Sequence, residues 1–377
     1  MKGGAAMRTT VMRISERALY NNALEIRKSV PAGVKMMCVV KADAYGHGSA
    51  FAARAMLRAG ADAFAVAIAE EAAELRAAGI TRPILILGGG GESSLRAAVA
   101  ADAAQAVYEG WMLDILQDEA KRRGVRAKAH LKIDSGMSRI GVRGDGALDE
   151  LLAHWKKSCP DVEMEGIFTH FCAADSDPDF TKQQNENFAA TLARVREAGF
   201  RPIAHAAATS AMAMPECQYD MFRAGIGLYG SCAPGLEGKI QPAQTLSAYP
   251  VRIQRIKAGE TVGYGRTFTA ARDSVIMTVP IGYGDGYPRA LSNRAEALVC
   301  GRRAKIAGRV CMDMIMLDVT DIPEAGLDSE VVLMGSQGNE RITPDELAEL
   351  ADTIPYEIML GFSPRVRREY VGMDDDR

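Results

Sequence analysis

Short apolar runs alternate with amphipathic segments between about residues 35 and 240 of the chain. The intervening segments carry charged residues on one face and Ala, Leu or Ile on the other, and many of them end in Gly, a common helix stop. Strands that are apolar throughout and are separated by helices indicate a parallel sheet covered on both sides. The apolar runs are KMMCVV (35–40), AFAVAIA (63–69), PILILG (83–88), AQAVY (104–108), AKAHLKI (127–133), MEGIFTHF (164–171), PIAHAA (202–207) and FRAGIGLYG (222–230).

This alternation predicts an α/β fold. Repeated β/α units of this number and length fit a (β/α)8 barrel of the TIM type, which we expect over residues 16–240. An open, doubly wound sheet is the alternative, because periodicity alone does not show that a sheet closes.

After residue 240 the pattern changes to β-strands separated by Gly turns, as in VRIQRIKAGETVGYG and DSVIMTVPIGYGDGYP. We therefore expect a separate, C-terminal β-rich domain over residues 241–377. One helix interrupts it, opened by Thr343-Pro344. The segment TTVMRIS (9–15) also has a strand pattern, and it is a candidate strand of this second domain.

Charge and composition narrow the class of protein. The net charge of -3 gives no basic face for nucleic acid, and no apolar run approaches the roughly 20 residues that span a bilayer. The first residues, MKGGAAMRTT, lack the apolar region of a signal peptide. We expect a cytoplasmic protein that binds neither membrane nor nucleic acid.

Cysteine and histidine usage gives no metal or disulfide pattern. The seven cysteines are widely spaced and form no C-x-x-C pair, and the five histidines form no H-x-x-x-H or H-E-x-x-H pattern. We therefore expect no disulfide framework and no metal site.

Lys41 is the first candidate for chemistry, because it directly follows an apolar strand and barrel enzymes place catalytic groups at strand C-termini. Burial there lowers the pKa of a lysine and makes its amine nucleophilic. A strand-end lysine that extends to solvent is the alternative interpretation. The full string VVKADAYGHG favours a ligand site, since its Gly-His-Gly lets the backbone close around a bound molecule.

That string resembles the cofactor-lysine motif of the alanine racemase family, VVKANAYGHG. The resemblance covers nearly the whole chain, and the order and spacing of its motifs are more specific than any one of them. The further motifs are LKIDSGMSRIGV (131–142), FTHF (168–171), FRAGIGLYG (222–230), VGYGRTF (262–268), PIGYGDGYPR (280–289), GRVCMDM (308–314) and YEI (356–358).

The resemblance implies an alanine racemase that binds pyridoxal 5'-phosphate and works as a homodimer. Lys41 would hold the cofactor, and Tyr264 would face it from the other subunit. Racemisation removes the α-proton from one face and returns one to the opposite face, so two opposed bases suit it. By resemblance, Lys41 serves the D-face and Tyr264 the L-face. Read without the family, Tyr264 in V-G-Y-G is an aromatic residue filling a turn.

The resemblance also implies contacts to the cofactor. Arg223 would hydrogen-bond the pyridine nitrogen and leave the ring neutral, because arginine is always protonated. His170 would pack near the ring and bond towards Arg223. The phosphate would lie at the strand end that barrels often use for phosphate, and its contacts would be Tyr45, Ser210, Gly225 and Ile226.

Two substrate contacts and one modification follow in the same way. Arg139 would lie near the substrate carboxylate, which suits its planar fork, and the backbone amide of Met312 would help to hold that carboxylate. Lys132 matches a lysine that is carbamylated in some members of the family, where the added negative charge would hold Arg139 in place.

Three strings depart from the family pattern. The family's H-x-A-N-S is here His205 to Ser210 with no asparagine, and G-Y-A-D-G is Gly282 to Gly286 with glycine in place of the alanine at the third position. Pro364 stands where some members have a tyrosine that reaches the phosphate, and proline has no donor. This change keeps open an alternative substrate, serine or a broader set of small amino acids. A non-catalytic cofactor-binding barrel is the alternative of another class, although such proteins lack the second domain.

Overall fold

The computed structural model describes residues 9–231 and 233–373. It contains two compact units. One is Leu19–Gln241, and the other combines residues 9–18 with residues 242–373. Among the residues that the structure describes, no helix is both long and apolar enough to cross a membrane.

The first unit is built on an eight-stranded parallel sheet with the order β8-β7-β6-β5-β4-β3-β2-β9. Backbone hydrogen bonds from Asp220 N to Ala204 O (3.0 Å) and from Arg223 N to Ala207 O (3.1 Å) join β9 back to the β8 edge. The sheet is therefore a barrel and not an open sheet. Its strands are β2 (Lys35–Val39), β3 (Ala63–Val66), β4 (Ile84–Ile86), β5 (Ala104–Val107), β6 (Ala127–Lys132), β7 (Val162–Phe168), β8 (Ile203–His205) and β9 (Met221–Ala224).

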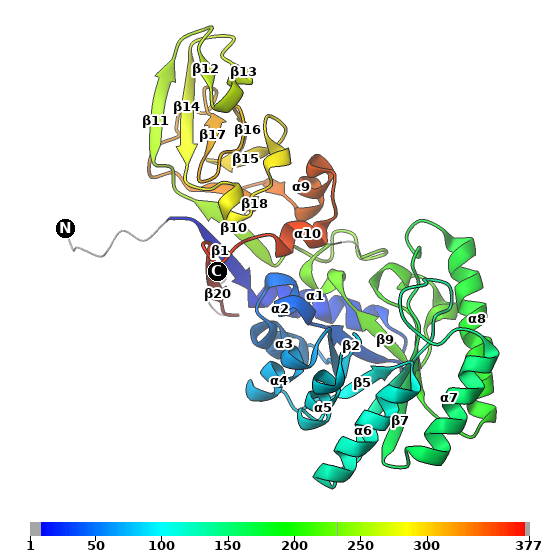
Figure 1. Ribbon diagram of the computed structural model, residues 1–377. Helices are drawn as coiled ribbons and strands as arrows, with labels where there is room; N and C mark the ends of the chain where they lie inside the picture. The colour runs from blue at the N-terminus through cyan, green and yellow to red at the C-terminus, as the bar shows by residue number, and fades with distance from the viewer. Residues whose placement is uncertain (1–8, 232, 374–377) are drawn as a thin grey trace. The chain divides into compact units, whose positions relative to one another are not determined.

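Helices surround this barrel, and Figure 1 shows them outside the strands. Strands such as β3 and β4 are buried at every position because the helices cover one face and the barrel interior the other. The helices are α1 (Glu16–Ser29), α2 (Lys41–Gly46), α3 (Ser49–Arg58), α4 (Ala69–Ala77), α5 (Glu92–Ala100), α6 (Gly110–Arg123), α7 (Asp145–Ser158) and α8 (Pro178–Glu197), with the 3-10 turns η1 (Thr209–Ala211), η2 (Pro215–Cys217) and η3 (Ile226–Tyr229).

The second unit is β-rich. Its main sheet runs β11-β14-β17-β16-β15-β18-β10-β1-β20, and β19 pairs with β18. The strands are β10 (Gln244–Ala248), β11 (Arg252–Ile256), β12 (Thr261–Val262), β13 (Phe268–Thr269), β14 (Ser274–Val279), β15 (Glu296–Val299), β16 (Arg302–Ile306), β17 (Ile315–Asp318), β18 (Val331–Gln337), β19 (Glu340–Ile342) and β20 (Arg367–Val371).

The N-terminal strand β1 (Val11–Ser15) lies inside this sheet, antiparallel to β10 and parallel to β20. It is apolar on its buried positions, so the sheet takes its strands from both ends of the chain. Two helices interrupt the unit where the sequence pattern predicts one. The Thr343 hydroxyl caps α9 (Pro344–Ala351) by accepting from Glu346 N at 3.0 Å, and the short α10 (Pro355–Leu360) follows.

Candidate active site

Lys41 follows β2 at the C-terminal end of the barrel strands, and the chain after it turns left-handed. Ala42, Asp43, Ala44 and Tyr45 all have φ between 52° and 55°. Non-glycine residues adopt this conformation at a cost of about 1–2 kcal/mol each, so four in succession need strong local support. Strain of this kind concentrates at ligand sites.

Hydrogen bonds from several elements hold this turn. Asp43 accepts from Gly48 N through its carbonyl (2.9 Å) and from Ser49 N through its carboxylate (2.8 Å). Glu71, on α4, accepts from Ala42 N at 2.6 Å with one oxygen and from Ala67 N at 2.7 Å with the other. The carboxylate of Glu71 therefore ties the turn to the end of β3.

Aromatic packing supports the other side of the turn. The ring of Tyr45 lies 4.7 Å from that of Tyr229, whose hydroxyl donates to Val39 O at 2.8 Å. The ring of His47 also lies against Tyr229, at 4.6 Å. Lys41 is thus held at the edge of a fixed and strained segment.

Cationic side chains gather around Lys41. Burial and the nearby Arg139 guanidinium lower the pKa of Lys41, whereas Glu71 opposes them. Burial and the charge of Arg223 lower the pKa of Lys132 to about 7. The Lys132 amine donates to Ile133 O at 2.7 Å. This end of the barrel is therefore electropositive and suits an anionic ligand.

Arg223, on β9, is buried inside the barrel, and burial lowers its pKa to about 9, so it stays charged at neutral pH. Its Nη1 donates to His205 Nδ1 (2.8 Å) and His205 O (3.1 Å). Its Nη2 donates to Thr169 O (2.8 Å) and Ala206 O (2.7 Å). His170 Nδ1 lies farther from Nη2, at 3.4 Å. Four N–H groups of the guanidinium are thus used within the chain.

A line of hydrogen bonds continues from Arg223 across the barrel interior. His205 Nε2 lies 2.9 Å from His130 Nδ1, and His130 Nε2 lies 3.1 Å from Glu165 Oε2. Because Arg223 only donates, His205 accepts at Nδ1 and carries its proton on Nε2, and His130 then donates to Glu165. Two pKa shifts agree with this arrangement. Burial holds the pKa of His205 well below its usual value, and the hydrogen bond from His130 lowers the pKa of Glu165.

Gly225 follows β9 and, having no side chain, leaves open the space that a Cβ would fill, here called the Gly225 recess. Thr209 Oγ1 accepts from Gly225 N at 2.9 Å. A Cβ on Gly225 would lie 3.6 Å from Thr209 Oγ1 and 3.8 Å from the Tyr45 hydroxyl, so two hydroxyls line the space above it. Ile226 opens the 3-10 turn η3 directly afterwards. Ser210 is half-buried in the turn η1, next to Thr209.

Arg139 lies at the tip of the loop that follows β6. Asp134 shapes this loop by accepting from Gly136 N and Ser138 N, both at 3.0 Å. Val142 closes the loop, because its N donates to Lys132 O (2.9 Å) and its O accepts from Asp134 N (3.0 Å). The loop therefore presents Arg139, which is exposed, at the same end of the barrel as Lys41 and Lys132.

Tyr264 belongs to the other unit, in the 3-10 turn η4 (Tyr264–Arg266), and 72% of it is exposed. The glycines on either side, Gly263 and Gly265, have φ of 75° and 69°, a conformation that favours glycine. A side chain that fills a turn would be covered by its neighbours. The backbone here instead projects Tyr264 away from its own unit.

Met312 also belongs to this unit and is 52% exposed, on the segment between β16 and β17. Its carbonyl accepts from Gly284 N at 2.8 Å. Arg365 donates to Asp313 at 2.7 Å and pairs with the buried Asp285 at 3.4 Å. The segment with Met312 is thus fastened to the turn at Gly284.

The structure places His170 near four other sequence-predicted residues of the first unit, because burial and the charges of Arg223, Arg139, Lys132 and Lys41 lower the pKa of His170 to about 3. It adds residues that the sequence analysis did not name: Glu71, His130, Glu165, Thr209 and Tyr229. Of these, Tyr229, which lies in the string FRAGIGLYG, and Thr209 had a signal in the sequence. The family pattern has its serine four residues after the histidine, and the residue four after His205 is Thr209.

Comparison with known proteins gives one family over both units. The model of the alanine racemase N-terminal domain matches residues 14–233, and that of the alanine racemase C-terminal domain matches residues 243–370. The chain is 40% identical to an alanine racemase of Citrifermentans bemidjiense, covering 97% of this chain and 99% of that protein. It is 42% identical to an alanine racemase of Symbiobacterium thermophilum, covering 97% and 98%.

Solved structures agree with this match. The alanine racemase from Bacillus anthracis, with bound L-Ala-P, superposes with a TM-score of 0.88 at 35% identity and covers 98% of this chain and 96% of that one. The alanine racemase from D-cycloserine producing Streptomyces lavendulae gives 0.90 at 33% identity, with 98% of each chain covered. Because the fold, both domain models and these relatives agree, the chain belongs to the alanine racemase family.

Proposed function

We propose that this protein is an alanine racemase that interconverts L-alanine and D-alanine with pyridoxal 5'-phosphate. The observation that carries the proposal is the meeting of Lys41, Lys132, Arg139 and Arg223 at the C-terminal end of one barrel. A lysine of lowered pKa among arginines suits an aldehyde cofactor with a phosphate group and a substrate with a carboxylate.

The residues at the strand ends fit this cofactor. A phosphate would lie over Gly225, where a Cβ would occupy the recess and where the hydroxyls of Thr209 and Tyr45 converge. The Thr209 oxygen accepts from Gly225 N and still has its own hydrogen to donate. Ile226 N and Ser210 lie beside the same recess and are further proposed contacts. When bound, pyridoxal phosphate supplies a conjugated ring that delocalises negative charge from the substrate Cα.

Arg223 faces the ring nitrogen in this proposal. Its Nη1 and Nη2 hydrogens are used by His205, Thr169 and Ala206, so the Nε–H is the donor left for a ligand. A guanidinium donates a hydrogen bond without giving up its proton, so the ring nitrogen stays unprotonated. The neutral imidazoles behind it lead to Glu165 and hold the guanidinium in one orientation. His170 packs beside it.

Lys41 and Tyr264 move the α-proton on opposite faces of the substrate. The lowered pKa of Lys41 gives a neutral amine, which accepts a proton, at a lower pH than an exposed lysine would. The exposed Tyr264, held between two left-handed glycines, donates and accepts at the other face from a second copy of the chain. The proposed enzyme is therefore a two-fold homodimer.

The substrate carboxylate would bind Arg139 and the backbone amide of Met312. We also propose that Lys132 is carbamylated, because a lysine with a pKa of about 7 has a neutral amine available to carbon dioxide at physiological pH. The carbamate would add a negative charge between Arg223 and Arg139 and hold the guanidinium of Arg139 for the substrate.

Serine racemisation is the second candidate, and Pro364, which is exposed and has no side-chain donor, is the observation behind it. A non-catalytic cofactor-binding barrel fits less well, because the β-rich unit presents Tyr264 and Met312.

A turnover panel with single enantiomers of alanine, serine and larger amino acids tests the proposal. We expect cofactor-loaded enzyme to convert L-alanine and D-alanine into each other with the highest kcat/KM of the panel. A higher kcat/KM for serine would favour the second candidate, and a protein that binds the cofactor but turns over no amino acid would contradict both.

A further inference from the structure

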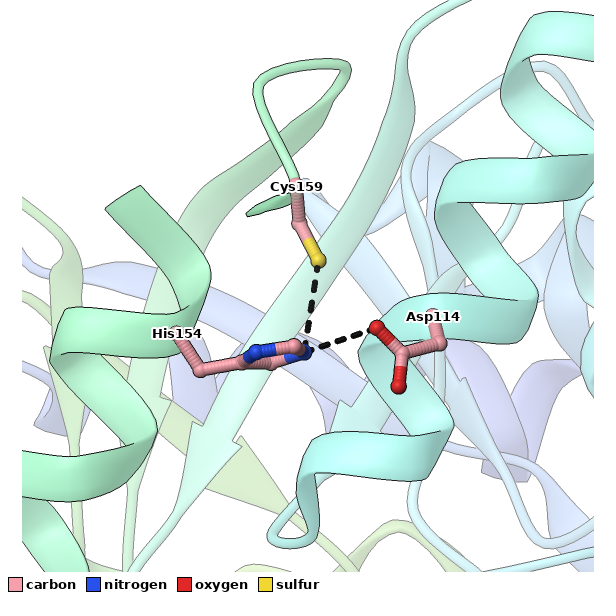
Figure 2. Close-up of side chains that lie close together, drawn as sticks. All are labelled: Asp114, His154 and Cys159. Carbon is pink, nitrogen blue, oxygen red and sulfur yellow. Dashed lines mark hydrogen bonds and ion pairs between the residues drawn. The ribbon is translucent and has the colours of Figure 1, made fainter. Parts of the chain in front are cut away.

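Three side chains of different metal-binding chemistry meet on the helices outside the barrel. Asp114 lies on α6, His154 lies on α7, and Cys159 follows the end of α7. Figure 2 shows the carboxylate, the imidazole and the thiol directed towards one another. None of the three belongs to the residues that we propose for cofactor or substrate.

The three ligand atoms are close enough to share one ion. His154 Nε2 lies 2.7 Å from Asp114 Oδ1 and 3.9 Å from Cys159 Sγ, and all three atoms lie within 4.8 Å of one another. Around tetrahedral zinc, with bonds of about 2.0–2.3 Å, neighbouring ligand atoms are separated by about 3.3–3.8 Å. Binding of zinc requires the Asp114–His154 separation to widen and the two separations from Cys159 to settle into this range, and the Asp114 side chain, 56% exposed, has room to rotate.

A nucleophilic cysteine is the other arrangement that these residue types suggest, and the geometry does not support it. In a catalytic triad the carboxylate orients the imidazole through one nitrogen while the nucleophile meets the other. Here Asp114 and Cys159 both approach Nε2. A metal ion displaces the thiol proton to solvent when it binds.

The surroundings offer a fourth ligand and further negative charge. His154 lines a cleft of about 430 Å³ together with Glu150, which lies one helical turn before it on α7. Water can complete the coordination from this cleft. Asp118 lies near enough to influence Cys159 and adds negative charge, while Lys121 opposes it.

We propose that Asp114, His154 and Cys159 form a site for Zn²⁺ that links α6 to α7. Thiolate, imidazole and carboxylate are the ligands that zinc takes in proteins, and the mixed set disfavours Mg²⁺ and Ca²⁺, which prefer oxygen. No metal motif is visible in the sequence because Asp114 and His154 are 40 residues apart and come together only when α6 packs beside α7.

The test is metal binding by the full-length, cofactor-loaded enzyme after removal of metal with a chelator. We expect isothermal titration with Zn²⁺ to give one site per chain, and Co²⁺ to give the visible bands of a tetrahedral site with a thiolate ligand. Asp114→Asn, His154→Ala and Cys159→Ser should each weaken Zn²⁺ binding by ~10–100-fold or more. Cys300→Ser, which removes an exposed thiol in the other unit, is the matched control and should leave binding unchanged.

Two results would overturn the proposal. One is the absence of Zn²⁺ uptake at micromolar concentrations, and the other is uptake that Asp114→Asn and His154→Ala leave unchanged. These two variants alter partly exposed helix positions, so they keep the test valid even if replacing the buried Cys159 unfolds the protein. Circular dichroism and cofactor absorption confirm folding of each variant.

Discussion

The two units of this protein present their proposed active-site residues in opposite ways. In the barrel, Lys41 starts a strained turn that Glu71 and Tyr229 support, and Arg223 is buried with four of its donors bonded. In the β-rich unit the backbone is fixed, but the side chains of Tyr264 and Met312 are exposed. The barrel residues are thus held by contacts within their own unit, whereas the side chains of Tyr264 and Met312 are left exposed by theirs.

Substitution of Lys41, which begins the strained turn of the barrel, should have the largest effect on turnover. Lys41→Ala removes both the attachment point of the cofactor and one of the two bases, so we expect turnover to fall to background. Borohydride reduction of the loaded enzyme followed by peptide mapping should place the label on Lys41. A label on another lysine would show that the strained turn serves a different purpose.

Tyr264→Phe should have the next largest effect. Loss of the hydroxyl should slow racemisation by ~10²–10⁴-fold, the usual contribution of a positioned acid or base. Because Tyr264 is 72% exposed, stability should change little, and cofactor binding should persist.

Exchange of the α-hydrogen with deuterated water distinguishes an opposed base from a turn residue. The Tyr264→Phe variant should still exchange the α-hydrogen of D-alanine through Lys41, without inversion, and should exchange that of L-alanine far more slowly. Equal losses for the two enantiomers would contradict the opposed-base mechanism.

Substitutions of Thr209 and Ser210 test which hydroxyl of the barrel contacts the cofactor phosphate. Thr209→Val removes the hydroxyl over Gly225. We expect the dissociation constant of the cofactor to rise ~10-fold, because one hydrogen bond to a charged group is lost. Ser210→Ala should have a smaller effect because Ser210 lies beside this recess. Fluorescence titration of each apo-variant with cofactor measures the two dissociation constants. A larger increase for Ser210→Ala than for Thr209→Val would assign the phosphate contact to Ser210.

The smallest expected effect on activity is the response to carbon dioxide through Lys132. Its pKa of about 7 means that the amine becomes neutral, and able to react with carbon dioxide, as pH rises through 7. We expect activity in carbon dioxide-free buffer to fall severalfold above pH 7 and to recover with bicarbonate, with less response below pH 6.5. Lys132→Arg, which keeps a charge but forms no carbamate, should lose the response, and bicarbonate dependence in that variant would exclude Lys132.

The sequence was sufficient for the barrel, since eight buried strands produce apolar runs and the strand-end position singles out Lys41. It was insufficient for the left-handed turn, because Ala, Asp and Tyr do not normally adopt positive φ and only tertiary contacts impose it. His130 and Glu165 were also not found. Each lies within a strand pattern, and their relation to Arg223 exists only after β6, β7, β8 and β9 pair.

Six of the seven cysteines are described, and all six are free thiols, as the absence of a pairing pattern predicts; Cys232 lies outside the described residues. The metal site proposed at Asp114, His154 and Cys159 differs from the expectation of no metal. Motif spacing reports ligands that are near in sequence, and two of these ligands are on different helices.

In the proposed dimer, Tyr264 of one chain completes the barrel site of the other, and mixing two inactive variants tests this arrangement. Lys41→Ala and Tyr264→Phe are unfolded together, refolded with cofactor at equal concentration and assayed for D-alanine formation. In a two-fold dimer, half of the molecules are mixed and one of their two sites regains both bases, so we predict recovery of about a quarter of wild-type activity. Recovery of no activity, from variants that form mixed dimers by mass spectrometry, would contradict the account.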